Sequence, residues 1–142
     1  GLSLADLSSK DFRISSTAKT PTPLPVEFLA FEATANVLHY MITTIGEYPF
    51  QKLANVESKT KYGGMENASN IFYNELVVDG NKNIESLIAH EVAHQWWAHQ
   101  VIGANVQGAT LMSESLSEYS SLKVLEKEYG REKMQIFLRE LR

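Results

Sequence analysis

The sequence predicts an α+β domain, in which a small, mostly antiparallel sheet packs on a central helix and further helices follow toward the C-terminus. Three segments have the apolar spacing of helices, at residues 26–45, 83–100 and 111–129, and two shorter runs at 53–58 and 70–78 have the pattern of strands. The chain has 142 residues, of which 44% are hydrophobic and 21% charged. This is the composition of one ordinary globular domain with a real core.

The N-terminal segment, residues 1–22, is rich in Ser and Thr, and we expect a linker or the end of a preceding module there, with the domain itself in residues 23–142. Prolines at positions 21, 23 and 25 favour extended backbone, so the first helix should begin only after Pro25. Gly46 should end that helix, and a fourth, amphipathic helix should follow Gly130. The chain lacks an initiator Met and ends inside an apparent helix, which leads us to expect a piece of a larger protein.

Charge and cysteine content argue against several kinds of partner and site. The 13 basic and 17 acidic residues give a net charge of −4 without a basic cluster, which argues against nucleic acid as a partner. The absence of cysteine excludes disulfides and thiolate metal sites. No apolar run approaches the roughly 20 residues of a membrane-spanning helix, so we expect no membrane segment in this chain. The compartment stays open.

The helix expected over residues 83–100 contains the sequence His90-Glu91-Val92-Ala93-His94. Two histidines four positions apart lie about 40° from each other around a helix axis, so both imidazoles can bind one ion. Glu91 is rotated by about 100° from His90 and borders the same face without competing for the metal. This H-E-x-x-H pattern is typical of zinc peptidases, in which the carboxylate takes a proton from water. A chance occurrence on an exposed helix is disfavoured, because this helix is apolar around most of its surface.

A catalytic zinc site takes three protein ligands, so the chain must supply one more after the two histidines. Glu114 and Glu118 follow His94 by 20 and 24 positions and share one face of the next helix. We assign Glu114 as the ligand, because it lies nearer the start of that helix, where the preceding loop returns. Glu118 can then orient a ligating histidine by accepting its second N–H, although both acids could be ordinary surface residues. His99 is a poorer ligand because it is rotated about 140° from His94, and His39 is more simply a packed or half-exposed side chain.

Two adjacent glycines, Gly63 and Gly64, precede Met65, Glu66 and Asn67 between the two predicted strands. Adjacent glycines beside a strand allow special dihedral angles or the close approach of another backbone. From the glycines alone, a hairpin turn is the simpler interpretation.

Three motifs occur in one order along the chain: Gly-Gly-Met-Glu-Asn at 63–67, His-Glu-x-x-His at 90–94 and Ser-Glu-Ser at 113–115. Together they resemble the zinc aminopeptidases of family M1, and the likeness covers about residues 25–141. The resemblance implies a zincin fold with a thermolysin-like catalytic domain that hydrolyses peptide bonds. It implies one zinc ion per chain, bound by His90, His94 and Glu114, with Glu91 as the catalytic base.

The resemblance also gives the first motif a role in substrate binding. In family M1 the Gly-x-Met-Glu-Asn strand lies along the substrate. This implies that Glu66 binds the free α-amino group of the peptide, and that the backbone of Gly63 and Gly64 contacts the peptide near the scissile carbonyl. A carboxylate fixed near the metal favours substrates with a positive terminus there. The expected reaction is therefore the release of single residues from a peptide with a free N-terminus.

The chain departs from the usual family pattern in two places. The 19 residues between His94 and Glu114 are one more than the usual M1 gap and equal the gap of thermolysin-type enzymes. Ser113-Glu114-Ser115 stands where Asn-Glu-Gly is common. This version is similar to the M1-type domains found in some bacterial proteins fused to transporter permease segments, which implies a membrane-associated parent protein.

Two other functions stay open. A thermolysin-like endopeptidase is favoured by the length of the gap and disfavoured by the motif at 63–67. An inactive zinc-bearing binding or scaffold domain is disfavoured by Glu91, since a purely structural site does not need that carboxylate. The family also uses a downstream tyrosine hydroxyl to stabilise the oxyanion. Tyr119 and Tyr129 are poorly placed for this on their helix, so we expect zinc binding but little peptidase activity from this chain alone.

Overall fold

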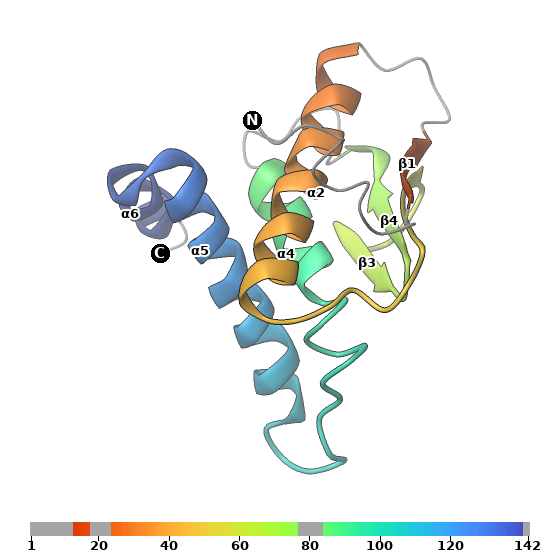
Figure 1. Cartoon of the computed structure of the whole chain (residues 1–142), viewed down its shortest axis with the longest axis vertical. Helices are drawn as coiled ribbons and strands as arrows, with labels where there is room; N and C mark the ends of the chain where they lie inside the picture. The colour runs from red at the N-terminus through yellow and green to blue at the C-terminus, as the bar shows by residue number, and fades with distance from the viewer. Residues whose placement is uncertain (1–12, 18–23, 77–83, 141–142) are drawn as a thin grey trace.

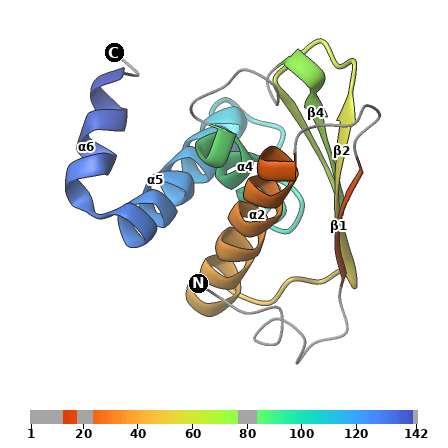
Figure 2. The same cartoon turned by 90° about the horizontal axis from the view of Figure 1, so that it is seen from above.

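A four-stranded sheet with helices on one face makes up the part of the chain that the computed structural model describes, residues 13–17, 24–76 and 84–140 (Figure 1). The strands lie in the order β1-β2-β4-β3. Their bounds are β1 (Arg13–Thr17), β2 (Lys52–Ser58), β3 (Gly64–Asn67) and β4 (Asn70–Asn74). Figure 2 shows the helices stacked beside one face of this sheet, which confirms the predicted α+β class.

The sheet is mixed, whereas the sequence predicted a mostly antiparallel one. β1 and β4 both run parallel to β2, and among the described strands β3 alone runs antiparallel to its neighbour, β4. The β1–β2 pair is parallel because helix α2 (Leu24–Thr44) connects the two strands and returns the chain in the same direction. The prediction set residues 1–22 apart from the sheet and so missed this crossover. Of that segment the structure describes residues 13–17, and the domain boundary near residue 22 stays a prediction.

The glycine pair does not form the hairpin turn that the glycines alone suggested. Gly64 begins β3, and the turn lies at Ala68 and Ser69, where Ser69 has a φ of 59°. The chain leaves β2, crosses to the edge of the sheet, runs back as β3 and returns as β4 between them. β3 is therefore an edge strand, and one side of its backbone is available to partners outside the sheet.

One helix lies between β1 and β2, and the other helices and one π-helical turn follow β4. Their bounds are α2 (Leu24–Thr44), α4 (Ile84–Ala93), the π-helical turn η1 (Leu111–Ser115), α5 (Leu116–Tyr129) and α6 (Arg131–Glu140). α2 begins before the expected position, because Pro25 lies in its first turn, where the missing N–H would not be bonded. β4 ends at Asn74 rather than at residue 78, and residues 77–83 lie outside the described part. None of the helices described here is long and apolar enough to cross a membrane.

Helix α4 lies at the centre of this arrangement, in contact with α2, α5 and the edge strand β3. The largest fully buried apolar side chains come from α2, the two inner strands and α4: Val37, Leu38, Met41, Leu53, Ile71, Ile88 and Val92. The buried Trp96 indole N–H donates a hydrogen bond of 3.0 Å to the carbonyl of Gly46, which ties the end of α4 to the end of α2. The core thus fixes α4 firmly beneath the edge of the sheet.

Candidate metal centre

His90 and His94 lie at the C-terminal end of α4, where the helix changes geometry. The backbone N–H of His94 bonds to the carbonyl of His90 at 3.2 Å, so the two residues remain one turn apart. Their Nε2 atoms lie 3.0 Å from each other. The two histidines therefore present one nitrogen each to the same point, as their spacing predicts.

The predicted continuation of this helix to residue 100 is wrong, because α4 ends at Ala93. The N–H groups of Gln95 and Trp96 bond to carbonyls three residues back, at 3.0 Å each, which tightens the chain into turns. Ala98 then has a φ of 131°, which no helix allows. Neither glycine nor proline marks this end, so the sequence carried no signal of it.

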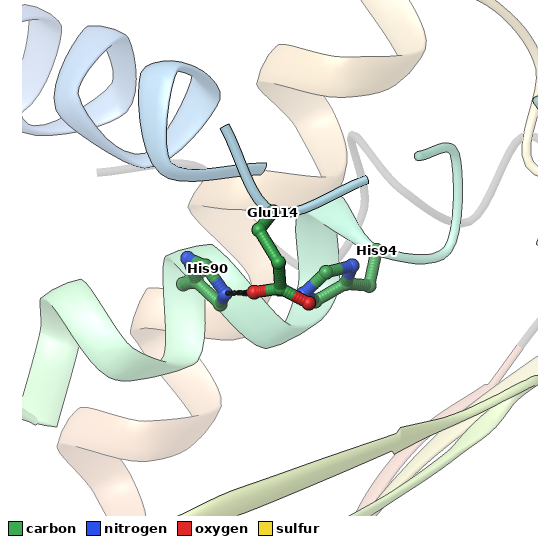
Figure 3. Close-up of side chains that lie close together, drawn as sticks. All are labelled: His90, His94 and Glu114. Atoms are coloured by element: carbon green, nitrogen blue, oxygen red, sulfur yellow. Dashed lines mark hydrogen bonds and ion pairs between the residues drawn. The ribbon is translucent and has the colours of Figure 1, made fainter. Parts of the chain in front are cut away.

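The carboxylate of Glu114, which belongs to the π-helical turn η1, lies next to both histidine rings (Figure 3). Its Oε2 atom lies 3.2 Å from His90 Nε2 and 3.6 Å from His94 Nε2. One potential ligand atom from each of the three residues lies within 4.8 Å of the others. Two imidazole nitrogens and one carboxylate oxygen are a donor set that zinc prefers in catalytic sites. The residues present therefore fit a zinc ion.

The second nitrogen of each imidazole is held by a hydrogen-bond acceptor. His90 Nδ1 lies 2.9 Å from Glu118 Oε2, and His94 Nδ1 lies 2.9 Å from the carbonyl of Trp97. A proton on each Nδ1 leaves the Nε2 lone pair free to bind an ion. Burial alone would lower the pKa of His90, but the hydrogen bond to Glu118 and the charges of Glu91, Glu118 and Glu114 together raise it.

Glu91 is buried against the edge strand beside these residues. A β-carbon added at Gly64 would lie 2.2 Å from Glu91 Oε1, so the glycine leaves the space that the carboxylate fills. Burial is the main cause that raises the pKa of Glu91 to about 7; the charge of His90 opposes this rise, and the charges of Glu66 and Glu114 add to it. A carboxyl group that titrates near neutral pH has the property required of a general base.

The face of β3 that carries Gly64 also carries Glu66. Exposure alternates along the strand, so that Gly64 and Glu66 are half-buried while Met65 and Asn67 are exposed. Residues two apart in a strand point to the same side, so Glu66 shares the side of Gly64, which lies against Glu91. The carbonyl of Gly63 is used within the sheet, because it accepts the N–H of Asn74 at 3.0 Å.

The remaining histidines lie elsewhere among the described residues. His39 is half-buried on α2, and His99 contacts the carbonyl of Glu66 through its Nε2 atom. Neither belongs to the cluster formed by His90, His94 and Glu114.

Of the two tyrosines that follow Glu114, one is largely exposed and the other contacts a different acid. Tyr119 is 61% exposed on α5. Burial and a hydrogen bond to Glu85 raise the pKa of Tyr129, and Glu85 lies in the first turn of α4, at the opposite end from the two histidines.

Sequence reasoning missed Gln95 and Tyr73, both of which lie next to the candidate site. Gln95 is fully buried and bonds to the backbone of the β3–β4 turn. Tyr73 on β4 is also buried, and burial together with the charge of Glu91 raises its pKa well above the ordinary value. A glutamine directly after the second histidine, on a buried helix, was the signal available for the first; for Tyr73 the sequence offered none.

Comparison with known proteins places this geometry in a family. The model of the peptidase family M1 domain matches residues 29–141. Leukotriene A-4 hydrolase of Xenopus laevis is 29% identical over 104 residues, which are 72% of this chain and 17% of that protein. Leucine aminopeptidase 2-1 of Meyerozyma guilliermondii is 26% identical over 113 residues, 76% of this chain and 18% of that protein.

A solved structure shares the fold as well. Native leukotriene A4 hydrolase of Saccharomyces cerevisiae superposes with a TM-score of 0.61 at 20% identity, over 82% of this chain and 19% of that one. The chain thus spans less than a fifth of the length of each of these relatives. With a family model that covers most of its length and a shared fold, the chain belongs to peptidase family M1.

Proposed function

We propose that this chain carries the zinc-binding core of an aminopeptidase, which releases single residues from the free N-terminus of peptides. The observation that carries the proposal is the meeting of His90, His94 and Glu114 directly beside Glu91 and the strand that bears Glu66. Membership of family M1 supports peptide-bond hydrolysis, and the geometry of the described residues supports the individual roles.

In this proposal His90, His94 and Glu114 hold one zinc ion, which when bound would polarise the substrate carbonyl and make water more acidic. Glu91 accepts the proton of the attacking water and passes it to the leaving amine. Its burial suits this exchange, because it holds the pKa of the carboxyl at about 7 in the metal-free chain. Glu118 and the carbonyl of Trp97 keep the two imidazoles in the orientation that binding needs.

Glu66 gives the proposal its specificity for the end of the peptide. Glu66 is half-buried on the side of β3 that faces Glu91, and none of the basic residues in the described part of the chain forms an ion pair with it. A substrate ammonium group could take that place, with a charge-assisted hydrogen bond. The backbone of Gly64 would then lie along the first residue of the peptide, since a glycine allows close approach.

A thermolysin-like endopeptidase is the second candidate, and one observation favours it. The gap between His94 and Glu114 has 19 residues, and the extra residue coincides with the π-helical turn η1 that carries Glu114. A π-helical turn holds one more residue than an α-helical turn, so it can absorb such an insertion without moving the helix that follows. The insertion therefore does not require a different substrate.

The test compares the zinc-loaded chain, and the longest natural chain that contains it, on leucine p-nitroanilide and on its N-acetylated form. We expect a preference of at least about 100-fold for the free amine, which Glu66→Gln should largely abolish. Met65→Gln, an exposed neighbour on the other side of β3, is the matched control. Equal cleavage of both reporters, or cleavage within a blocked peptide, would favour the endopeptidase.

The 142 residues alone should turn over slowly in this test. Tyr119 is exposed and Tyr129 bonds to Glu85, so neither supplies the oxyanion donor whose loss typically costs about 10² to 10³ in rate. Fast turnover by the isolated chain would contradict this part of the proposal. Fusion of the parent protein to permease segments, and its association with a membrane, stay predictions from the resemblance.

A further inference from the structure

Gln95, the residue directly after His94, connects the turn that follows α4 to the edge of the sheet. Its side chain is fully buried, with a relative exposure of 0%. Its Oε1 atom accepts the N–H of Ser69 at 2.7 Å, and its Nε2 donates to the carbonyl of Asn67 at 3.1 Å. Both partners lie at the β3–β4 turn, more than 25 residues earlier in the chain. A buried amide that uses both its donor and its acceptor fixes the two segments relative to each other.

His99 makes a second connection of the same kind. Its Nε2 donates to the carbonyl of Glu66, the residue next to Asn67 on the edge strand. β3 pairs with β4 on one side, so this bond is made by the strand's other, open side. Three backbone positions close together in the chain, Glu66, Asn67 and Ser69, are therefore bonded to the segment that follows His94.

These bonds also hold the turn in an unusual conformation. Ser69 has a φ of 59°, a region that costs a non-glycine residue about 1 kcal/mol or more. The hydrogen bond from its N–H to Gln95 compensates for part of this cost. Without Gln95, the turn next to Glu66 would lose this stabilisation.

We propose that Gln95 and His99 are positioning residues that set the place of the Glu66 carboxylate relative to His90 and His94. Through them, the segment that follows α4 fixes how far the amine-binding group lies from the reacting carbonyl, and this distance sets the release of one residue. This inference rests on the proposed function of Glu66. The side chains of both residues bond to the backbone of β3 and of its turn, so we assign them no role in holding the ion.

The experiment measures binding of leucine hydroxamate and of N-acetyl-leucine hydroxamate to the zinc-loaded chain, by calorimetry. The ratio of the two dissociation constants reports how strongly the chain prefers the free amine to the acetylated one. Zinc affinity is measured separately. Gln95→Met, which keeps the length of the side chain and removes its hydrogen bonds, should reduce the ratio about tenfold or more. His99→Phe should act in the same direction, and both variants should keep zinc affinity within about threefold of the unchanged chain.

Gln100→Met is the matched control. Gln100 donates its side-chain hydrogen bond to the nearby carbonyl of Gln95 at 3.1 Å and, in the part of the chain that the structure describes, does not bond to β3, so the ratio should not change. Amide hydrogen exchange of Ser69 gives a readout that needs neither zinc nor ligand. Its N–H should exchange at least about tenfold faster in Gln95→Met than in Gln100→Met, because its acceptor is gone.

The possible outcomes distinguish a failure of the positioning role of Gln95 and His99 from a failure of the proposed role of Glu66. If the unchanged chain binds both hydroxamates equally, the proposed role of Glu66 fails and the inference fails with it. If the unchanged chain prefers the free amine and folded Gln95→Met and His99→Phe keep that preference, the inference alone is wrong. Should Gln95→Met not fold, the half-buried His99 carries the same test through His99→Phe.

Discussion

His90 Nδ1 lies 2.9 Å from Glu118 Oε2, while the Nε2 atom of the same ring lies 3.2 Å from Glu114 Oε2. The ring is thus held between two acids of one helical segment, which begins with the turn η1 and continues as α5. One carboxylate fixes the tautomer and the other faces the lone pair. The contact between α4 and α5 therefore orients the candidate metal ligands before any ion binds.

Glu118→Ala should weaken zinc binding by about 10- to 100-fold, because His90 would lose the acceptor that fixes its ring. Glu118→Gln should lose less, since its amide oxygen can still accept the Nδ1 proton. Glu128→Ala, an exposed acid on the same helix, is the control. Zinc competition with a fluorescent chelator measures each affinity, and equal affinities for Glu118→Ala and Glu128→Ala would contradict the orienting role.

Glu91 should make the metal-free chain less stable as the pH rises. Its pKa is raised from 4.5 to about 7 in the folded state, so the stability it contributes is present below pH 4.5 and is lost as the pH rises through about 7. A shift of this size corresponds to about 3 kcal/mol, and the raised pKa of His90 acts in the same direction.

Glu91→Gln should remove this loss, because glutamine cannot ionise. Urea unfolding with a chelator present should show similar stability of both proteins at pH 4.5 and a more stable Glu91→Gln protein at pH 8. Glu132→Gln, at an exposed position on α6, should match the unchanged chain at both values. If the difference in stability between Glu91→Gln and the unchanged chain does not vary with pH, the pKa of Glu91 is not raised by burial.

Ala98→Gly should stabilise the fold by about 1 kcal/mol. Ala98 has a φ of 131°, which side chains with a β-carbon rarely adopt and which costs on the order of 1–3 kcal/mol. Glycine avoids this cost but loses some backbone entropy on folding. Ala104→Gly is the control, because Ala104 is not among the described non-glycine residues with positive φ, and it should be neutral or destabilising. Thermal unfolding that ranks Ala98→Gly below the unchanged chain would show that this backbone is not strained.

The spacing of the motifs allowed the centre of the site to be predicted. Positions 90 and 94 must share a helix face, and an acid at the start of the next helix can return to them. The structure brings His90, His94 and Glu114 together and places Glu118 against His90. These relations are local to helices, whose period is read directly from the sequence.

Features that depend on distant or strained segments could not be predicted in the same way. The sheet is mixed because β1 pairs with β2 across a helix, and the sequence near β1 has only a short alternation of polar and apolar residues, at positions 11–14. The end of α4 depends on Ala98, which has a glycine-like φ without being glycine. The bonds of Gln95 to the β3–β4 turn join residues 26 and 28 positions apart, which no periodicity reports.

The most direct test of the account is the zinc stoichiometry and coordination of the purified chain. Elemental analysis should find one zinc per chain, and X-ray absorption should find two imidazole nitrogens and one carboxylate oxygen at about 2.0–2.2 Å. Glu114→Gln should lose most of the zinc, whereas Glu132→Gln should keep it. A chain that binds no zinc, or whose zinc is unaffected by Glu114→Gln, would contradict the site formed by His90, His94 and Glu114.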